Sequence, residues 1–364
     1  MTLIYQLALT RVKGIGQALA KQLLITFGSA EEVFRAPKKQ LLKIPGIGAT
    51  LAANLMDRNV LAEAERELVF LEKHHIQPLF WESEHYPAKL KECIDAPVLL
   101  YYKGNADLQC KRIISVVGTR NATAYGKRIC DEFIASLKHS GALIVSGLAY
   151  GIDSYVHQAC VEQGIDTVGV LGHGLDRIYP AANRGLAREM LHHGGLLTEY
   201  PSGTNPDRQN FPSRNRIIAG LADVTVVVEA AMKGGALITA ELANTYNRDV
   251  CAFPGDIYKN FSGGCNYLIK THRAHLIQSA KDLAYLMDWD FNIPKEQEQP
   301  SAGNVPENPV EKMVYEAIKQ KGSIGVDELA NGTQLLPSKL AMILLALEMS
   351  GLLVALPGKI YQIA

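Results

Sequence analysis

Four short segments of the chain combine glycines with hydroxyl or cationic side chains, a composition suited to binding anions. Glycine lets the backbone approach a ligand closely, and the free N–H groups at the start of a helix attract phosphate. The segments therefore predict a binding site for a phosphate-bearing ligand rather than a catalytic centre. They are VGTRNATAYGKR (117–128), SGLAYGID (146–153), FPSRNRIIAGLAD (211–223) and EAAMKGGALITAEL (229–242).

The first two segments each follow an apolar run and supply candidate phosphate contacts. In the first, Gly118 permits a close approach, Thr119 offers a hydroxyl and Arg120 offers a planar cation. In the second, Ser146 and Gly147 keep the loop small beside a hydroxyl. The alternative explanations are an exposed turn arginine in the first segment and a purely structural loop in the second.

In the third segment Arg214 and Arg216 bracket Asn215 and lead into an apolar helix. Two arginines beside buried sequence need anionic partners. Phe211 adds an aromatic face on which a base could stack, as in single-strand binding without sequence preference. The alternative is an internal ion-pair network with nearby acids, namely Glu199, Asp223 and Glu229.

In the fourth segment Lys233, Gly234 and Gly235 open a helix and predict another anion site. The segment lacks the GxxxxGK[ST] pattern of a nucleotide-hydrolysing loop, and the first segment lacks GxGxxG. The six cysteines include no CxxC pair, and the histidines have no acidic or thiol partner at metal-ligand spacing. No cofactor and no metal are therefore expected.

The elements that must position these segments follow from an alternation of strand and helix over residues 111–287. Continuous apolar, β-branched runs separated by amphipathic stretches indicate a buried, mostly parallel sheet of Rossmann-like α/β type. Ligands bind such sheets at the carboxyl ends of the strands, where the four segments begin. The apolar runs are 113–118, 142–147, 167–172, 196–200, 224–230 and 250–255.

Two smaller modules are predicted on either side of this domain. Residues 1–60 contain two GIG turns, at 14–16 and 46–48, and eight Lys or Arg against three Asp or Glu. This duplication indicates a helix-hairpin-helix (SAM-like) module, and its contact with DNA is left open. Residues 310–364 predict three helices and a hairpin, the outline of a winged helix. The remaining residues are assigned to a connecting segment with a lead-in strand (61–110) and a flexible, proline-containing linker (288–309).

The overall charge and hydropathy limit the classes of protein to consider. The formal net charge of the 364 residues is zero, so any nucleic-acid site must be local rather than spread over the surface. No apolar run approaches the roughly 20 residues that span a membrane. No basic segment followed by an apolar core marks a secretory leader at the N-terminus. A cytosolic protein without membrane contact is expected.

The motifs VGTR, SGLAYGID, GHGLDRIYP, FPSRNRIIAGLAD, GGALITA and FPGDI occur in this order, and together they resemble the DNA-processing protein A (DprA, or Smf) family over residues 80–285. The resemblance implies a non-enzymatic protein that binds single-stranded DNA in a basic pocket through the candidate residues named above. It also implies a homodimer that protects DNA and loads recombinase A onto it, in natural transformation or recombination. One departure is KGGALITA, where a serine often follows the glycine in that family.

Two alternative functions compete with this interpretation. The sheet and its glycine loops also resemble the lysine-decarboxylase-like nucleotide phosphoribohydrolases, whose PGGxGTxxE loop carries a catalytic glutamate. The corresponding stretch here, MKGGALITAE (232–241), lacks the Gly-Thr pair and places Glu241 in a different context. The other alternative is an interaction scaffold that uses its end modules and has a silent pocket.

Overall fold

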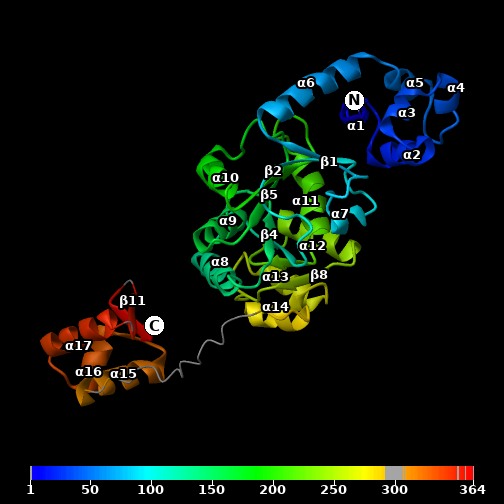
Figure 1. Ribbon diagram of the computed structural model, residues 1–364. Coiled ribbons are helices and arrows are strands. Elements are labelled where there is room, and N and C mark those ends of the chain that lie inside the picture. The colour runs from blue at the N-terminus through cyan, green and yellow to red at the C-terminus, as the bar shows by residue number, and fades with distance from the viewer. Residues whose placement is uncertain (1, 292–305, 307, 351, 357, 364) are drawn as a thin grey trace. The chain divides into compact units, whose positions relative to one another are not determined.

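The computed structural model divides the chain into two compact units, Met1–Asn292 and Ile293–Ala364 (Figure 1). Each unit has its own hydrophobic core. All helices among the described residues are too short or too polar to span a membrane. The residues that the structure describes are 2–291, 306, 308–350, 352–356 and 358–363.

A nine-stranded sheet forms the centre of the first unit, in the order β1-β2-β6-β5-β4-β3-β7-β8-β9. The neighbouring strands from β6 to β9 in this order all pair in parallel. Strand β2 pairs antiparallel with both of its neighbours, β1 and β6. The prediction of a Rossmann-like, mostly parallel sheet is confirmed. The strands are β1 (Gln77–Phe80), β2 (Leu99–Gly104), β3 (Ile113–Val117), β4 (Leu143–Ser146), β5 (Thr167–Leu171), β6 (Gly194–Thr198), β7 (Val224–Val227), β8 (Asp249–Ala252) and β9 (His275–Leu276).

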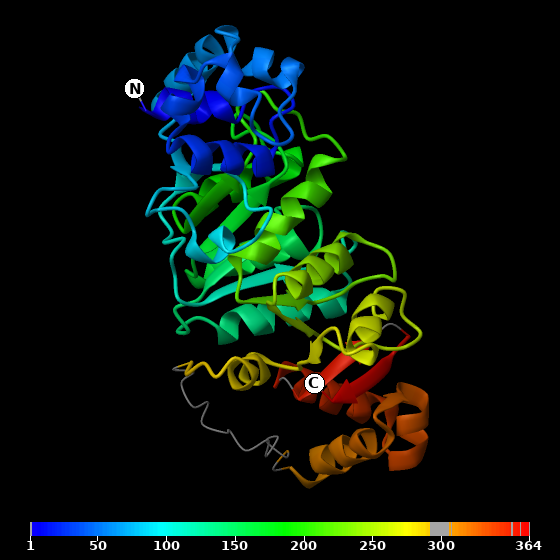
Figure 2. The ribbon, with the colours of Figure 1, turned by 90° about the vertical axis from the view of Figure 1, so that its right-hand side faces the viewer.

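Helices cover both faces of this sheet. Helices α8, α9 and α10 lie on one face, and α11 and α12 lie on the opposite face (Figure 1, Figure 2). The central strands β3 to β7 are buried along their whole length, which explains why their sequences are continuously apolar rather than alternating. The helices are α7 (Ala88–Lys91), α8 (Ala124–Ser136), α9 (Ile152–Gln163), η1 (Ala181–Asn183), α10 (Arg184–Met190), α11 (Asn210–Leu221), α12 (Gly235–Thr245), α13 (Gly263–Lys270) and α14 (Ala280–Leu286).

The start of α11 differs from the sequence prediction. The segment FPSRNR was expected to be a loop that leads into an apolar helix, but α11 already begins at Asn210. Pro212 is tolerated there because a residue in the first turn has no intrahelical partner for its N–H group. Phe211, Arg214 and Arg216 therefore project from a helix rather than from a loop.

The N-terminal helical module has the predicted helix-hairpin-helix outline, but it comprises residues 2–73, because the helix Asn59–Lys73 continues past the predicted boundary at residue 60. Gly14 and Gly46 adopt φ values of +88° and +86°, which favour glycine, and lie three residues before the first residue of the helix that follows each turn. The core of the module is continuous with residues of β1 and β2, including Phe80 and Leu99, so the module packs on that end of the sheet. Its helices are α1 (Thr2–Leu9), α2 (Gln17–Phe27), α3 (Ala30–Arg35), α4 (Lys38–Leu41), α5 (Ala49–Leu55) and α6 (Asn59–Lys73).

The second unit is a winged helix, as predicted, with one strand that the sequence analysis missed. Strand β10 has three residues and follows the first helix, too short to give a recognisable pattern. It completes a sheet of order β10-β12-β11 around an apolar core. The elements are α15 (Pro309–Lys321), β10 (Ser323–Gly325), α16 (Val326–Thr333), α17 (Pro337–Met349), β11 (Leu353–Leu356) and β12 (Ile360–Ile363).

Most of the linker assigned to residues 288–309 lies outside the described residues. Its first part belongs to the folded unit, because Phe291 is buried and its ring lies 5.7 Å from that of Trp289. Arg112 donates a hydrogen bond to the carbonyl of Asp290. The folded unit therefore extends to residue 291, past the predicted boundary at 287.

A buried histidine on α9 packs against the sheet. The His157 side chain is fully buried, with Nδ1 2.7 Å from the Thr167 hydroxyl. Because that hydroxyl donates its own proton to the Ile144 carbonyl, Nδ1 must carry the proton of the imidazole. Nε2 has no partner among the described residues. Burial, together with the positive charge of Arg214, lowers the pKa of His157 to about 3, so the ring is neutral in the folded protein.

We expect this histidine to make stability fall in mild acid. An unfolded histidine binds a proton near pH 6.5, whereas folded His157 does not, so its contribution is complete above that pH and is lost below it. The slope is about 1.4 kcal/mol per pH unit at most. Urea unfolding at about pH 5 and about pH 7.5 should show a smaller difference for His157→Gln than for the wild type. His139→Gln, at an exposed site, is the matched control and should behave as wild type; equal slopes for all three proteins would contradict this account.

Candidate functional site

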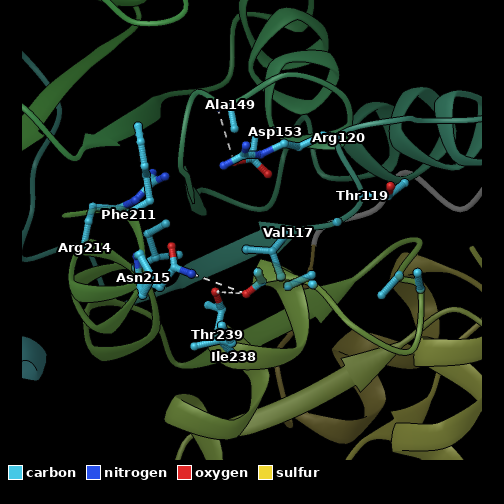
Figure 3. A pocket seen from close by; sticks show the side chains of 18 of the residues that line it. Val117, Thr119, Arg120, Ala149, Asp153, Phe211, Arg214, Asn215, Ile238 and Thr239 are labelled. Carbon is cyan, nitrogen blue, oxygen red and sulfur yellow. Dashed lines mark hydrogen bonds between the residues drawn. The ribbon is translucent and has the colours of Figure 1, made fainter. Parts of the chain in front are cut away.

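A cavity of about 790 Å³ opens at the carboxyl end of the sheet (Figure 3). It lies where the strand order switches direction, since the chain runs from β3 out to β6 and then returns to β7 on the other side of β3. In open α/β sheets a crevice forms at this point between the loops of the two adjacent strands. The walls include the segments after β3, β4, β5, β6 and β7 and parts of α11 and α12.

The cavity brings together nine of the twelve residues predicted from the sequence. Three others, Ser146, Gly147 and Arg216, do not line it. The nine are Gly118, Thr119, Arg120, Phe211, Arg214, Asn215, Lys233, Gly234 and Gly235.

Arg214 is a buried cation in the wall of the cavity. Its side chain donates a hydrogen bond to the carbonyl of Val170, while Nε has no partner among the described residues. Burial lowers the pKa of Arg214 to about 10, and the carboxylate of Asp153 opposes that shift. Burial likewise raises the pKa of Asp153, opposed by Arg214. Each of the two groups therefore favours the charged form of the other.

Gly147 provides the space in which this pair meets. A Cβ atom at that position would stand 2.1 Å from Arg214 Nη1 and 2.6 Å from Asp153 Oδ2. Any side chain would therefore displace the guanidinium or the carboxylate. The sequence predicts that Gly147 contacts the ligand; in the structure the side chains of Arg214 and Asp153 occupy the space beside its Cα atom.

Phe211 lies among cationic and aromatic side chains. The guanidinium of Arg120 lies 5.8 Å from the centre of its ring, and the ring of Tyr179 lies 5.8 Å away at 40°. Phe211 and Arg214 are three residues apart on α11, so they share a face of the helix. The sequence analysis missed Tyr179, although it lies in the GHGLDRIYP motif, and also missed Asn121 and Arg208, which line the same cavity.

The loop after β3 is fixed by Glu229 at the end of β7. The Thr119 N–H donates to the Glu229 carbonyl at 2.7 Å. The Thr123 hydroxyl and N–H donate to the two carboxylate oxygens of Glu229 at 2.6 and 3.0 Å. Glu229 thus orders this loop and, among the described residues, forms no ion pair with the arginines, contrary to the alternative that assigned it to an internal network.

The loop before α12 is held by α11. Asn215 Nδ2 donates to the Gly235 carbonyl at 3.3 Å, and the Thr239 hydroxyl donates to the same oxygen at 3.1 Å (Figure 3). Lys233 and Gly234 precede this anchor and are exposed. The start of α12 and the exposed Lys233 therefore line the cavity, where helix N–H groups and a cation favour an anion.

The charges of the cavity favour an anion. Among the described residues that line it, Asp153 is the single acid, and Arg214 lies close to it. Four cations line the same space, namely Arg120, Arg208, Arg214 and Lys233. No group of three or more histidines, cysteines and carboxylates in the described residues is arranged to hold a metal ion.

Ser146 and Arg216 are directed away from the cavity. The Ser146 hydroxyl is fully buried and donates to the Val116 carbonyl of the neighbouring strand at 2.6 Å. Arg216 forms an ion pair with Glu199 and donates to the Asp95 carbonyl. For Arg216 the geometry follows the alternative of an internal ion pair, which the sequence analysis had left open.

Three families match the chain in the order of its modules. DNA recombination-mediator protein A matches residues 77–288, more than half of the chain. A SAM-like helix-hairpin-helix tandem matches residues 7–58, and the DprA winged helix domain matches residues 297–359.

Similar proteins carry the same names. The DNA processing protein DprA of Streptococcus pneumoniae is 37% identical over 268 residues, covering 70% of this chain and 94% of the relative. That of Bacillus subtilis is 37% identical over 272 residues, covering 74% and 91%. Protein Smf of Synechocystis is 39% identical over 290 residues, covering 78% and 72%.

Two solved structures share the fold. The X-ray structure of DprA from Streptococcus pneumoniae has a TM-score of 0.66 and 34% identity, covering 79% of this chain and 98% of that one. DprA from Helicobacter pylori, whose structure concerns its single-stranded DNA binding mode, has a TM-score of 0.54 and 28% identity. It covers 59% of this chain and 97% of its own.

We expect the charge of Asp153 to be required for stability. Asp153→Asn keeps the size of the side chain but leaves Arg214 buried without a counter-ion, so the free energy of unfolding should fall by about 3–5 kcal/mol. Urea denaturation measures this difference. The matched control is Asp166→Asn at an exposed site, which should change stability by less than about 0.5 kcal/mol. Equal stability of the two variants would show that Asp153 does not support the buried cation.

Proposed function

The chain belongs to the DNA recombination-mediator protein A family, and we propose that its cavity binds single-stranded DNA without strong sequence preference. The observation that carries the proposal is a recessed space lined by four cations and one acid, with an aromatic ring at its side. By binding there, the protein would protect the strand during recombination or natural transformation. The single-stranded DNA binding of the Helicobacter pylori relative supports the same assignment.

The side chains of the cavity can contact the phosphate backbone and the faces of the bases in single-stranded DNA better than they can contact the edges of the bases. Arg120, Arg208 and Lys233 are exposed cations that can neutralise phosphates. Phe211 offers a ring on which any base can stack, whatever its sequence. Base stacking and phosphate contacts together give affinity without sequence readout.

The recessed position of Phe211 favours a single strand over a duplex. The bases of a duplex are stacked on each other, so their faces are not free for a protein ring. An unpaired base can leave the stack and lie on Phe211 at a cost that is smallest in single-stranded DNA. Duplex DNA would reach only the cations at the rim.

The enzyme alternative is weaker because its catalytic carboxylate is misplaced. Glu241 lies on α12, forms an ion pair with Arg273 and does not line the cavity. A nucleotide phosphoribohydrolase needs a carboxylate beside the sugar to be cleaved. Release of ribose 5-phosphate from a nucleotide by the purified protein would favour this alternative instead.

We assign recombinase A and a second copy of the chain as partners on the basis of family membership. Large apolar side chains stand exposed in the last part of the first unit, with fractional exposures of 79% for Ile257, 89% for Tyr258 and 87% for Tyr285. Exposed apolar groups of this size mark a surface that gains by being covered. They are candidates for the homodimer contact.

The winged helix is proposed to bind protein rather than DNA. Residues 308–364 hold five lysines, no arginine and five acids, so they have little charge with which to neutralise phosphates. Helix α17, which would enter the major groove in a DNA-binding winged helix, exposes Met342, Leu345 and Met349. An apolar face of this kind is suited to a protein partner or to self-association.

We expect the wild-type protein to bind labelled oligo-dT more tightly than the corresponding duplex, and Arg120→Gln to weaken that binding. Loss of one charged contact should cost about 1.5–3 kcal/mol, and the log–log salt slope should decrease in magnitude by about 0.7. Fluorescence anisotropy over a range of salt concentrations measures both. Arg128→Gln is the control, because Arg128 is exposed and paired with Glu132 on α8. Equal affinity for the duplex at moderate salt would refute the proposal.

Deletion of residues 300–364 should leave the affinity for single-stranded DNA within about threefold of the full chain, less than the 1.4 kcal/mol of a tenfold change. The same anisotropy titration with oligo-dT tests this expectation. The assignment of the winged helix would be wrong if the deletion abolished binding or if the isolated module bound duplex DNA at physiological salt.

A further inference from the structure

Arg216 leaves α11 on the side opposite to the cavity. Successive residues of a helix are rotated by about 100°, so Arg214 and Arg216 point about 160° apart around the axis. Arg214 faces the cavity, whereas Arg216 pairs with Glu199 at the end of β6. The side chains of this pair are 13% and 8% exposed, so the pair is largely shielded from solvent.

The same carboxylate receives a hydrogen bond from the N-terminal helical module. Gln17, the first residue of α2, donates from Nε2 to Glu199 Oε2 at 3.4 Å. Its amide oxygen accepts the N–H of Val98, just before β2, at 2.7 Å. One side chain of the module thus bridges the edge of the sheet and the partner of Arg216.

Glu199 depends on these donors. Oε2 accepts from both Arg216 and Gln17, whereas the buried Oε1 has no partner among the described residues. Moving this buried carboxylate would cost free energy, because in any other position its charge would still need hydrogen-bond donors or a counter-ion. The positions of α2, β6 and α11 are therefore linked through a single group.

A second contact of the module reaches the segment that leads to the cavity. Glu67 on α6 is 3% exposed, and it accepts hydrogen bonds from the Ser202 N–H at 2.9 Å and from its hydroxyl at 2.5 Å. Arg11 pairs with the same carboxylate at 2.7 Å. Ser202 lies six residues before Arg208, a cation of the cavity wall. The module thus contacts the chain at Glu199 and Ser202, both just before the turn that leads into α11.

We propose that Gln17, Glu199 and Arg216 form a positioning network through which docking of the N-terminal helical module sets the affinity of the cavity for single-stranded DNA. The proposal rests on the proposed function of the cavity. The three residues act by holding α11, and with it Phe211 and Arg214, rather than by touching DNA. The module is then part of the binding device.

Two other roles of these residues predict different results. If Arg216 contacts DNA directly, its loss removes a neutralised phosphate and lowers the salt slope by about 0.7. If the network is merely structural, its loss lowers stability and leaves affinity unchanged in the folded protein. A positioning role instead changes affinity with the salt slope preserved.

The first experiment measures oligo-dT binding to the full-length Gln17→Ala variant over a range of salt concentrations. We expect the Kd to rise about fivefold or more, the lower range of measured couplings between sites, with the slope of the wild type. Gln22→Ala is the control, because Gln22 lies on the same helix and its side chain takes no part in the network. Arg216→Gln should show the same unchanged slope, and a reduced slope would assign Arg216 to the DNA contact and overturn the proposal.

The second experiment uses the reciprocity of coupled equilibria. If docking favours DNA binding, DNA binding must favour docking by the same factor. Hydrogen exchange at the Val98 amide, which is bonded to Gln17, should slow when wild-type protein is saturated with oligo-dT. Without DNA, Arg216→Gln should accelerate exchange there relative to Arg128→Gln.

The two experiments separate this inference from the proposed function. If wild-type protein fails to bind oligo-dT, the proposed function is refuted. The proposed coupling to DNA is then refuted as well, whatever effect Arg216→Gln has on hydrogen exchange at Val98. If wild type binds but Gln17→Ala binds equally well, the proposed function stands and the positioning network is refuted. A Kd that rises at constant slope, together with slower exchange on binding, supports both.

Discussion

The burial of a full positive charge at Arg214 is the constraint on which the rest of the cavity depends. A guanidinium removed from water requires a counter-ion and hydrogen-bond acceptors, and these are Asp153 and the Val170 carbonyl. They can approach only because Gly147 has no side chain. With Arg214 fixed, the first turn of α11 is fixed too, and Phe211 stands on the same face.

Much of this arrangement can be predicted from the types of residue along the chain. Continuous apolar runs predict buried parallel strands, and the carboxyl ends of parallel strands meet at one edge of a sheet. The segments after β3 and β7, with Arg120 and Lys233, therefore had to converge whatever the detailed packing. The chemistry of phosphate binding followed from glycines and cations alone.

The sequence could not reveal the direction in which individual side chains point. Ser146 ends a strand whose side chains alternate between faces, and its hydroxyl turns to a neighbouring carbonyl rather than to the crevice. Arg214 and Arg216 are two residues apart, yet because FPSRNR is helical they serve opposite sides of α11. The partners of Gln17 and Glu67 lie so far along the chain that no spacing rule connects them.

That separation has a consequence for the newly made chain. Gln17 and Glu199 are 182 residues apart, which a ribosome making 5 to 20 residues per second needs roughly 10 to 40 seconds to bridge. During that interval the first six helices have emerged, but β6, on which β2 pairs, does not yet exist. The polar side chains that later join the module to the sheet remain in water until then. The N-terminal module is thus the first part of the chain to emerge, and it can pack on β1 and β2 before its contacts with Glu199 and Ser202 can form.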